Sequence, residues 1–292
     1  MAPRGKPRWR SLQRLGRLYK LVGMEDRVNA LEAAFADSEA RAAILRDQVD
    51  MLKSSQDVPP TLVKEFAAWK AQNPIPSRPL VSVCVATYNR ARLLTERCVR
   101  SVLEQTYDNL ELIVVGDACS DGTVAAMARI QDPRLTFINL DERGVYPADP
   151  ALRYLVAGTK PVNTALALAQ GDYITHLDDD DAYTPDRLAR LVQFAHEQQA
   201  DFVWHPFWFE NPAGQWILNE APRLAYGQIT TSSVFYRGWF TRLPFDPDAY
   251  RLLEPGDWNR FRRMKYLNPV CVRYPQPLLK HYREKNDASR SQ

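Results

Sequence analysis

Residues 81–117 read VSVCVATYNRARLLTERCVRSVLEQTYDNLELIVVGD, and this stretch decides the fold. Two apolar, β-branched runs, 81–89 and 110–117, flank a segment with helical character, 92–105. A strand, a helix and a second strand in this order predict two parallel strands joined by a helical crossover.

The same alternation continues along the chain. We expect a helix over 121–131, a strand over 135–140, a helix over 162–169 and a strand over 172–178. This order predicts an α/β domain with a Rossmann-like, mostly parallel sheet and helices on both faces. Ligands bind at the carboxyl ends of the strands in such sheets, so polar residues there are candidate sites.

The composition is that of a globular protein. The chain has 292 residues, of which 45% are hydrophobic, with 38 basic and 35 acidic residues. The four cysteines lie far apart without a CxxC pair, which argues against a zinc ribbon or a disulfide framework. No apolar run is long enough to span a membrane, and the N-terminus lacks the apolar core of a secretory signal. We therefore expect a cytoplasmic protein.

The formal charge of +3 hides two unlike parts. Residues 1–20 carry seven basic residues and no acid, which leaves 31 basic and 35 acidic residues, a net charge of −4, for the rest. This basic arm has apolar residues at near-helical spacing, so it suits an interfacial helix on the anionic inner face of the cell membrane. The alternative is a solvated tail. Nothing downstream resembles a nucleic-acid reader, and we expect no nucleic-acid partner.

Apolar residues in steps of three and four predict a long helix over 21–53. The seam is Leu21, Met24, Val28, Leu31, Phe35, Ser38, Ala42, Leu45, Val49 and Leu52, in which only Ser38 is polar. A strict period of 3.5 favours a coiled coil that makes a homo-oligomer over a helix packed on the chain's own globular body. Five prolines break residues 54–79, which we interpret as a linker with a short helix.

Polar residues gather at three predicted strand ends, 86–90, 116–121 and 178–181. The last consists of four consecutive aspartates, which repel one another unless a cation lies among them. Carboxylate oxygens suit Mg²⁺ or Mn²⁺ shared with substrate phosphates. A solvated acidic loop is the alternative, and the position after a buried strand argues against it.

Three ordered blocks of the sequence resemble family 2 of the inverting glycosyltransferases, which have the GT-A fold. The blocks are VSVCVATYNRARLL, SVLEQTYDNLELIVVGDACSDGT and NTALALAQGDYITHLDDDDAYTPDRL, within residues 79–191. The resemblance implies a glycosyltransferase domain over 80–292, with a donor-binding half, 80–181, and an acceptor half, 182–292.

The resemblance also implies roles for particular residues. Nucleotide-sugar contacts would come from Ala86, Thr87, Tyr88, Asp117, Asp178 and Asp179. Asp180 would be the main metal ligand, and Asp178 would bind ribose or the metal. Two positions depart from the family: Gly116 replaces an acid and Val162 replaces a common arginine. Lys160 is therefore a candidate contact for the diphosphate.

The second half must supply the catalytic base. Asp257 lies in a GDW sequence similar to the place where the family has its base, and Glu254 is the reserve candidate. A carboxylate there can take the proton of an acceptor hydroxyl. An N-cap is the alternative role for Asp257. His281 is a candidate third ligand of the metal or the diphosphate, or else a structural histidine. Residues 227–240 are predicted to form a strand near the acceptor.

These patterns predict a metal-dependent inverting transferase in polysaccharide or glycoconjugate synthesis. It would move a sugar from a nucleoside-diphosphate sugar, with UDP-sugars favoured, to a hydroxyl of a glycan, glycolipid or protein. The alternative is a non-catalytic, oligomeric, membrane-associated scaffold whose GT-A body binds a nucleotide sugar.

Overall fold

A computed structural model describes the backbone of residues 9–283 and the side chains of residues 27–283. The chain divides into two compact units, residues 1–56 and 57–292, which are described separately. Residues 1–8 of the predicted basic arm, and the side chains of its remainder, lie outside the described residues.

The N-terminal unit is formed by one helix, α1 (Trp9–Asp57). This helix runs through both the predicted arm and the predicted coiled-coil segment without a break. Leu31, Phe35 and Leu45 of the apolar seam are exposed, each between 61% and 70%. The coiled coil itself stays a prediction. No helix in the described part of the chain is apolar over enough residues to cross a membrane.

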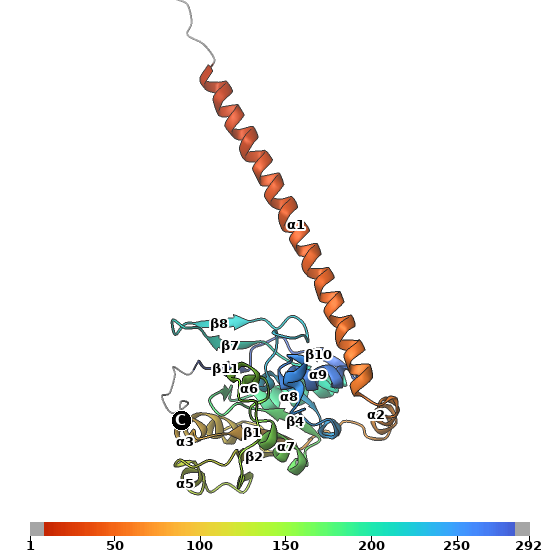
Figure 1. The fold of residues 1–292 in the computed structure, drawn as a ribbon, viewed down its shortest axis with the longest axis vertical. Coiled ribbons are helices and arrows are strands. Elements are labelled where there is room, and N and C mark those ends of the chain that lie inside the picture. The colour runs from red at the N-terminus through yellow and green to blue at the C-terminus, as the bar shows by residue number, and fades with distance from the viewer. Residues whose placement is uncertain (1–8, 284–292) are drawn as a thin grey trace, which may run out of the picture. The chain divides into compact units, whose positions relative to one another are not determined.

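The second unit is built on a seven-stranded sheet of order β10-β6-β9-β4-β1-β2-β3 (Figure 1). Its strands are β1 (Val81–Thr87), β2 (Leu110–Gly116), β3 (Leu135–Asn139), β4 (Tyr173–His176), β6 (Phe202–Trp204), β9 (Val234–Arg237) and β10 (Cys271–Arg273). Strand β9 alone is antiparallel to its neighbours, β4 and β6. The predicted α/β fold with a mostly parallel sheet is thus confirmed.

Apolar side chains cover both faces of this sheet. Val83 and Val85 of β1 face one core, together with Leu94 and Leu191, whereas Cys84 faces the other.

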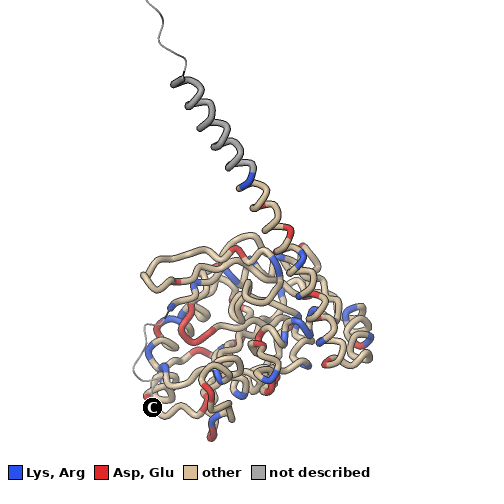
Figure 2. Tube along the Cα trace, turned by 45° about the horizontal axis from the view of Figure 1, so that its top comes forward, with Lys and Arg blue, Asp and Glu red and all other residues tan. Residues whose placement is uncertain are grey.

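The helices that follow β1 along the chain are α3 (Ala91–Leu93), continued by a π-helical turn (Leu94–Val99) and α4 (Arg100–Leu103), then α5 (Thr123–Met127), α6 (Pro150–Val156), α7 (Thr159–Leu168), α8 (Arg187–Gln198) and α9 (Gly256–Tyr266). Basic and acidic residues are interspersed over this unit (Figure 2).

A second sheet was not predicted from the sequence. Its order is β5-β11-β7-β8, from β5 (Ala182–Tyr183), β11 (Leu279–His281), β7 (Phe207–Glu210) and β8 (Trp216–Asn219). Strand β11 pairs antiparallel with β5, directly after the aspartate run. The chain's last described strand therefore returns to the acidic loop.

Two predicted segments differ from the structure. Within 54–79 the short helix is present as α2 (Pro60–Gln72), but it packs as part of the folded body. Phe66 is 2% exposed, and its ring centroid lies 5.0 Å from that of Trp239 and 4.9 Å from that of Phe240. The predicted strand over 227–240 is limited to β9, since Thr231–Ser233 form a 3-10 turn capped by the Thr230 side chain.

We predict that Phe66→Ala lowers the free energy of unfolding of the second unit by about 3–5 kcal/mol, because it removes a buried ring from an aromatic cluster. Urea denaturation measures this loss. Lys64→Ala, an exposed position on the same helix, is the control and should change it by less than about 0.5 kcal/mol. Equal effects of the two substitutions would show that α2 does not pack on the body.

Candidate active site

Strands β1 and β4 are parallel neighbours, so the polar residues that follow their carboxyl ends lie at the same edge of the sheet. A pocket of about 490 Å³ opens there, and residues 255–258 at the start of α9 also line it. Among the predicted site residues, Ala86, Asp178, Asp257 and His281 all line this pocket. The topology thus joins residues that lie up to 195 positions apart in the sequence.

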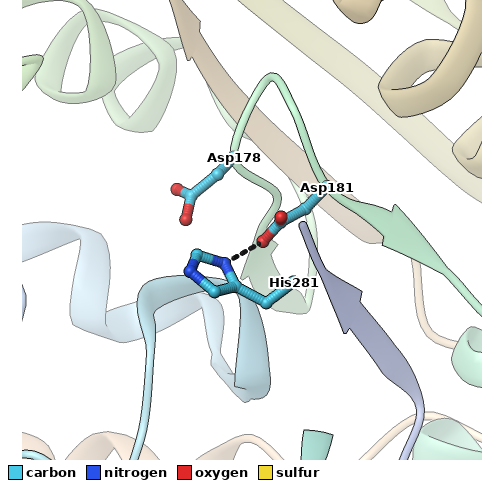
Figure 3. Close-up of side chains that lie close together, drawn as sticks. All are labelled: Asp178, Asp181 and His281. Atoms are coloured by element: carbon cyan, nitrogen blue, oxygen red, sulfur yellow. Dashed lines mark hydrogen bonds and ion pairs between the residues drawn. The ribbon is translucent and has the colours of Figure 1, made fainter. Parts of the chain in front are cut away.

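Asp178, Asp181 and His281 form a compact cluster (Figure 3). One ligand atom from each lies within 4.8 Å of the other two. The His281 ring shares a hydrogen bond with Asp181, 2.8 Å from Nδ1 to Oδ2, and the backbone N–H of Tyr282 donates to Asp181 Oδ1. Two carboxylates and an imidazole make a donor set that suits a divalent cation.

The electrostatics of this cluster reflect crowding. Burial, reinforced by the charges of Asp181 and Asp180, raises the pKa of Asp178 to about 8. Burial alone would lower the pKa of His281, but the hydrogen bond to Asp181 and the neighbouring carboxylates raise it to about 9. The raised pKa of Asp178 reflects the cost of placing a second negative charge in this buried cluster, and a bound cation would offset that cost.

Asp179 and Asp180 are held by different partners. Arg90, just after β1, forms ion pairs with both carboxylates. Thr87 Oγ1 donates to Asp179 Oδ2 at 2.7 Å, and Arg97 donates to the Asp180 carbonyl oxygen at 2.6 Å. Burial raises the pKa of Asp179 to about 7 although Arg90 opposes this. Asp180, the predicted main metal ligand, is thus paired with Arg90, and Asp181 takes the place beside His281.

Asp257 lies in the first turn of α9, at the pocket wall. Its Oδ1 accepts from the N–H of Trp258, and its Oδ2 accepts from Thr231 Oγ1 at 3.3 Å. Burial raises its pKa. Glu254 is instead buried in an ion pair with Arg262 and does not line the pocket. The geometry therefore favours Asp257 over Glu254 as a proton acceptor.

Asp117 and Tyr88 lie apart from this pocket, under residues 143–146. Asp117 accepts hydrogen bonds from the Gly144 N–H and the Tyr146 hydroxyl, both at 2.8 Å. The guanidinium of Arg143 stacks on the Tyr88 ring at 3.7 Å and lies 3.6 Å from Asp117. These two predicted nucleotide contacts therefore share a separate cluster that includes Arg143.

Gly116 replaces an acid of the family pattern, and the structure leaves no room for a side chain at this position. A Cβ there would lie 2.4 Å from Asn139 Oδ1, which accepts from the Cys119 N–H. Lys160 donates to the Glu142 carbonyl oxygen and does not line the pocket. Its neighbour Val162 does line it.

Sequence reasoning missed Asp181, Arg90, Arg143 and Tyr146. Asp181 had a usable signal, because it belongs to the same aspartate run as Asp178. Arg90 belongs to the predicted strand end 86–90, but its pairing with the aspartates depends on tertiary structure. Arg143 and Tyr146 lie in a segment that no local pattern marks.

The chain matches the family model "Glycosyl transferase family 2" over residues 82–148 and 158–252. It is 34% identical to the putative colanic acid biosynthesis glycosyl transferase WcaA of Escherichia coli K12, over 219 residues and 69% of each chain. Other curated relatives are matched over 20% to 55% of their own length.

Solved structures agree in fold. Residues 1–349 of S. aureus TarS, in complex with UDP-GlcNAc, have a TM-score of 0.55 at 19% identity, covering 73% of this chain and 61% of the TarS 1–349 chain. The mannosyltransferase PcManGT of Pyrobaculum calidifontis, in complex with GDP-Man and Mn²⁺, has a TM-score of 0.53 at 20% identity, covering 84% and 69%. The family match covers more than half of the chain and agrees with the sheet and the strand-end residues. The chain belongs to glycosyltransferase family 2.

Proposed function

We propose that the protein transfers a sugar from a nucleoside-diphosphate sugar to an acceptor hydroxyl, with inversion at the anomeric carbon. The observation that carries this proposal is that Asp178, Asp257 and His281 line one pocket. Asp178 and His281 suit a metal ion that binds a diphosphate, and Asp257 in the same pocket suits the removal of a proton.

Asp257 is the general base of this proposal. The acceptor oxygen forms a bond to the anomeric carbon while its proton passes to an oxygen of Asp257. The bond between the anomeric carbon and the diphosphate oxygen breaks at the same time, and its electron pair leaves with the nucleoside diphosphate. The Thr231 hydrogen bond fixes the orientation of the carboxylate, so the base need not reorganise during the reaction.

A divalent cation, Mn²⁺ or Mg²⁺, fits the donor set of Asp178, Asp181 and His281. When bound, such an ion neutralises charge that grows on the leaving diphosphate. Arg90 contributes a fixed positive charge beside Asp179 and Asp180. Asp180 would reach the ion only by giving up its ion pair with Arg90.

Donor and acceptor are proposed from the relatives. TarS has been solved with UDP-GlcNAc and PcManGT with GDP-Man, and we favour a UDP-sugar. The name of WcaA supports synthesis of a polysaccharide or glycoconjugate, so the acceptor would be a glycan, glycolipid or protein hydroxyl. We place this reaction in the cytoplasm, with the basic arm touching the anionic inner face of the membrane.

The second candidate function is a non-catalytic scaffold that binds a nucleotide sugar. A scaffold has no need of a base, and Asp257 at the pocket wall favours the transferase.

We expect Asp257→Asn to lower kcat by about 10²–10⁴-fold, the usual contribution of a general base, while donor affinity stays unchanged. Because burial raises the pKa of Asp257, the acid limb of kcat/KM should lie above the ordinary carboxyl range and should vanish in the variant. Asp248→Asn, at an exposed carboxylate, serves as the control. Full activity of Asp257→Asn would exclude this base.

We expect His281→Ala and Asp178→Asn each to weaken Mn²⁺ binding at least about 10-fold, because each removes one ligand atom. Isothermal titration of the full chain measures this directly. His196→Ala, at an exposed histidine on α8, should bind Mn²⁺ as the wild type does. Loss of binding in Asp180→Asn alone, with the other two variants unaffected, would move the site to Asp180.

We also propose that the seam of α1 pairs with a second copy of the chain. Leu31→Lys and Leu45→Lys place charges on the exposed seam and should shift sedimentation from an oligomer toward a monomer. Ala33→Lys, off the seam, should leave the oligomer intact. A wild-type chain that sediments as a monomer at every concentration would contradict the coiled coil.

A further inference from the structure

His176 is a buried polar residue of the pocket that the proposed mechanism does not use. It is the last residue of β4, two positions before Asp178, and it is 1% exposed. It lines the pocket together with Cys84, Val162 and Phe245. Its Nδ1 has no hydrogen-bond partner among residues 27–283. A buried polar atom without a hydrogen-bond partner costs free energy, so a ligand atom that pairs with it would bind more tightly.

The hydrogen-bond chain behind His176 fixes where its proton lies. Arg260 Nη1 donates to the Tyr236 hydroxyl oxygen at 2.6 Å, and this hydroxyl lies 2.5 Å from His176 Nε2. An arginine can only donate, so the Tyr236 hydroxyl hydrogen must find its acceptor elsewhere. His176 Nε2 is the acceptor in reach.

The consequence is a hydrogen on Nδ1. A neutral imidazole that accepts at Nε2 carries its single N–H at Nδ1. A charged imidazole carries an N–H at both nitrogens, so Nδ1 is a donor in either state. The hydrogen-bond chain from Arg260 through Tyr236 therefore makes His176 Nδ1–H a hydrogen-bond donor, which an oxygen acceptor would satisfy.

The place of His176 in the pocket indicates whose oxygen this is. His176 ends β4 and Asp178 follows two residues later, and both side chains line the pocket, so His176 lies near Asp178. In the proposed reaction the diphosphate lies at Asp178 and His281, and the anomeric carbon faces Asp257. The transferred sugar must lie between these two ends, in the space that His176 lines.

We propose that His176 Nδ1–H donates to an oxygen substituent of the transferred sugar and selects donors that carry this oxygen. The inference rests on the proposed transferase function and assigns the sugar-recognition residue of that same pocket. Because the surrounding wall is apolar, a sugar that lacks the oxygen leaves the donor unpaired, and sites of this kind reject such analogues strongly.

Two substitutions at His176 separate its nitrogens. In His176→Asn the side-chain amide lies near the position of Nδ1, so the pocket donor is kept and the Tyr236 partner is lost. In His176→Gln the amide lies near the position of Nε2, so the Tyr236 partner is kept and the pocket donor is lost. Both replace the ring by an amide, which makes them matched controls for each other.

The measurement is isothermal titration of the full chain with UDP-glucose, UDP-GlcNAc and GDP-mannose, each against UDP or GDP, with Mn²⁺ present. The wild type should bind one nucleotide sugar more tightly than its nucleoside diphosphate. His176→Gln should weaken this sugar-dependent part about 3- to 10-fold, the range of one neutral hydrogen bond, with UDP or GDP affinity unchanged. His176→Asn should retain more of it.

Deoxy analogues of the preferred donor test the same hydrogen bond from the side of the ligand. The wild type should bind them equally well except at one position, and His176→Gln should be indifferent to that position. Unchanged sugar affinity in His176→Gln, or an equal loss of nucleoside diphosphate affinity, would overturn the role of His176 alone. Failure of the wild type to bind any nucleotide would overturn the proposed function as well.

Discussion

Four consecutive carboxylates at the end of a buried strand, Asp178 to Asp181, are the constraint on which the site depends. Two like charges about 4 Å apart repel by about 4 kcal/mol at an effective dielectric constant of about 20. The fold divides them among several partners. Arg90 pairs with Asp179 and Asp180, and His281 hydrogen-bonds Asp181. Burial and the neighbouring carboxylates raise the pKa of Asp178 to about 8, and this residue lines the pocket.

The topology explains how these partners arrive. Strand β1 precedes Arg90 and lies beside β4, so the arginine reaches the acidic loop from a parallel neighbour. Strand β11 pairs with β5, with Lys280 opposite Ala182. The next residue, His281, therefore lies beside Asp181, the last aspartate of the run. Helix α9 supplies Asp257 to the lining of the same pocket. Each of these contacts joins segments that are far apart in the sequence, and together they surround one space.

Much of this arrangement could be predicted from the sequence. The β-branched runs at 81–89 and 110–117 gave the parallel sheet because a buried strand has a strong local signature. The strand-end aspartates and Asp257 lay in motifs that resemble the family. The second sheet, the packing of α2 and the pairing of Arg90 with Asp180 could not be predicted, since each depends on long-range contacts without a local pattern. The prediction of a linker over 54–79 missed the packing of α2, because prolines occur both in linkers and in connections that pack on a folded body.

The central claim is that the pocket catalyses transfer and does not merely bind. The most direct test is release of free nucleoside diphosphate from UDP-glucose, UDP-GlcNAc and GDP-mannose by the full chain with Mn²⁺ and a panel of acceptor sugars. We predict that one donor is consumed, that nucleoside diphosphate and transferred sugar appear in equal amounts, and that Asp257→Asn abolishes both. A wild-type chain that binds these donors and consumes none would contradict the account.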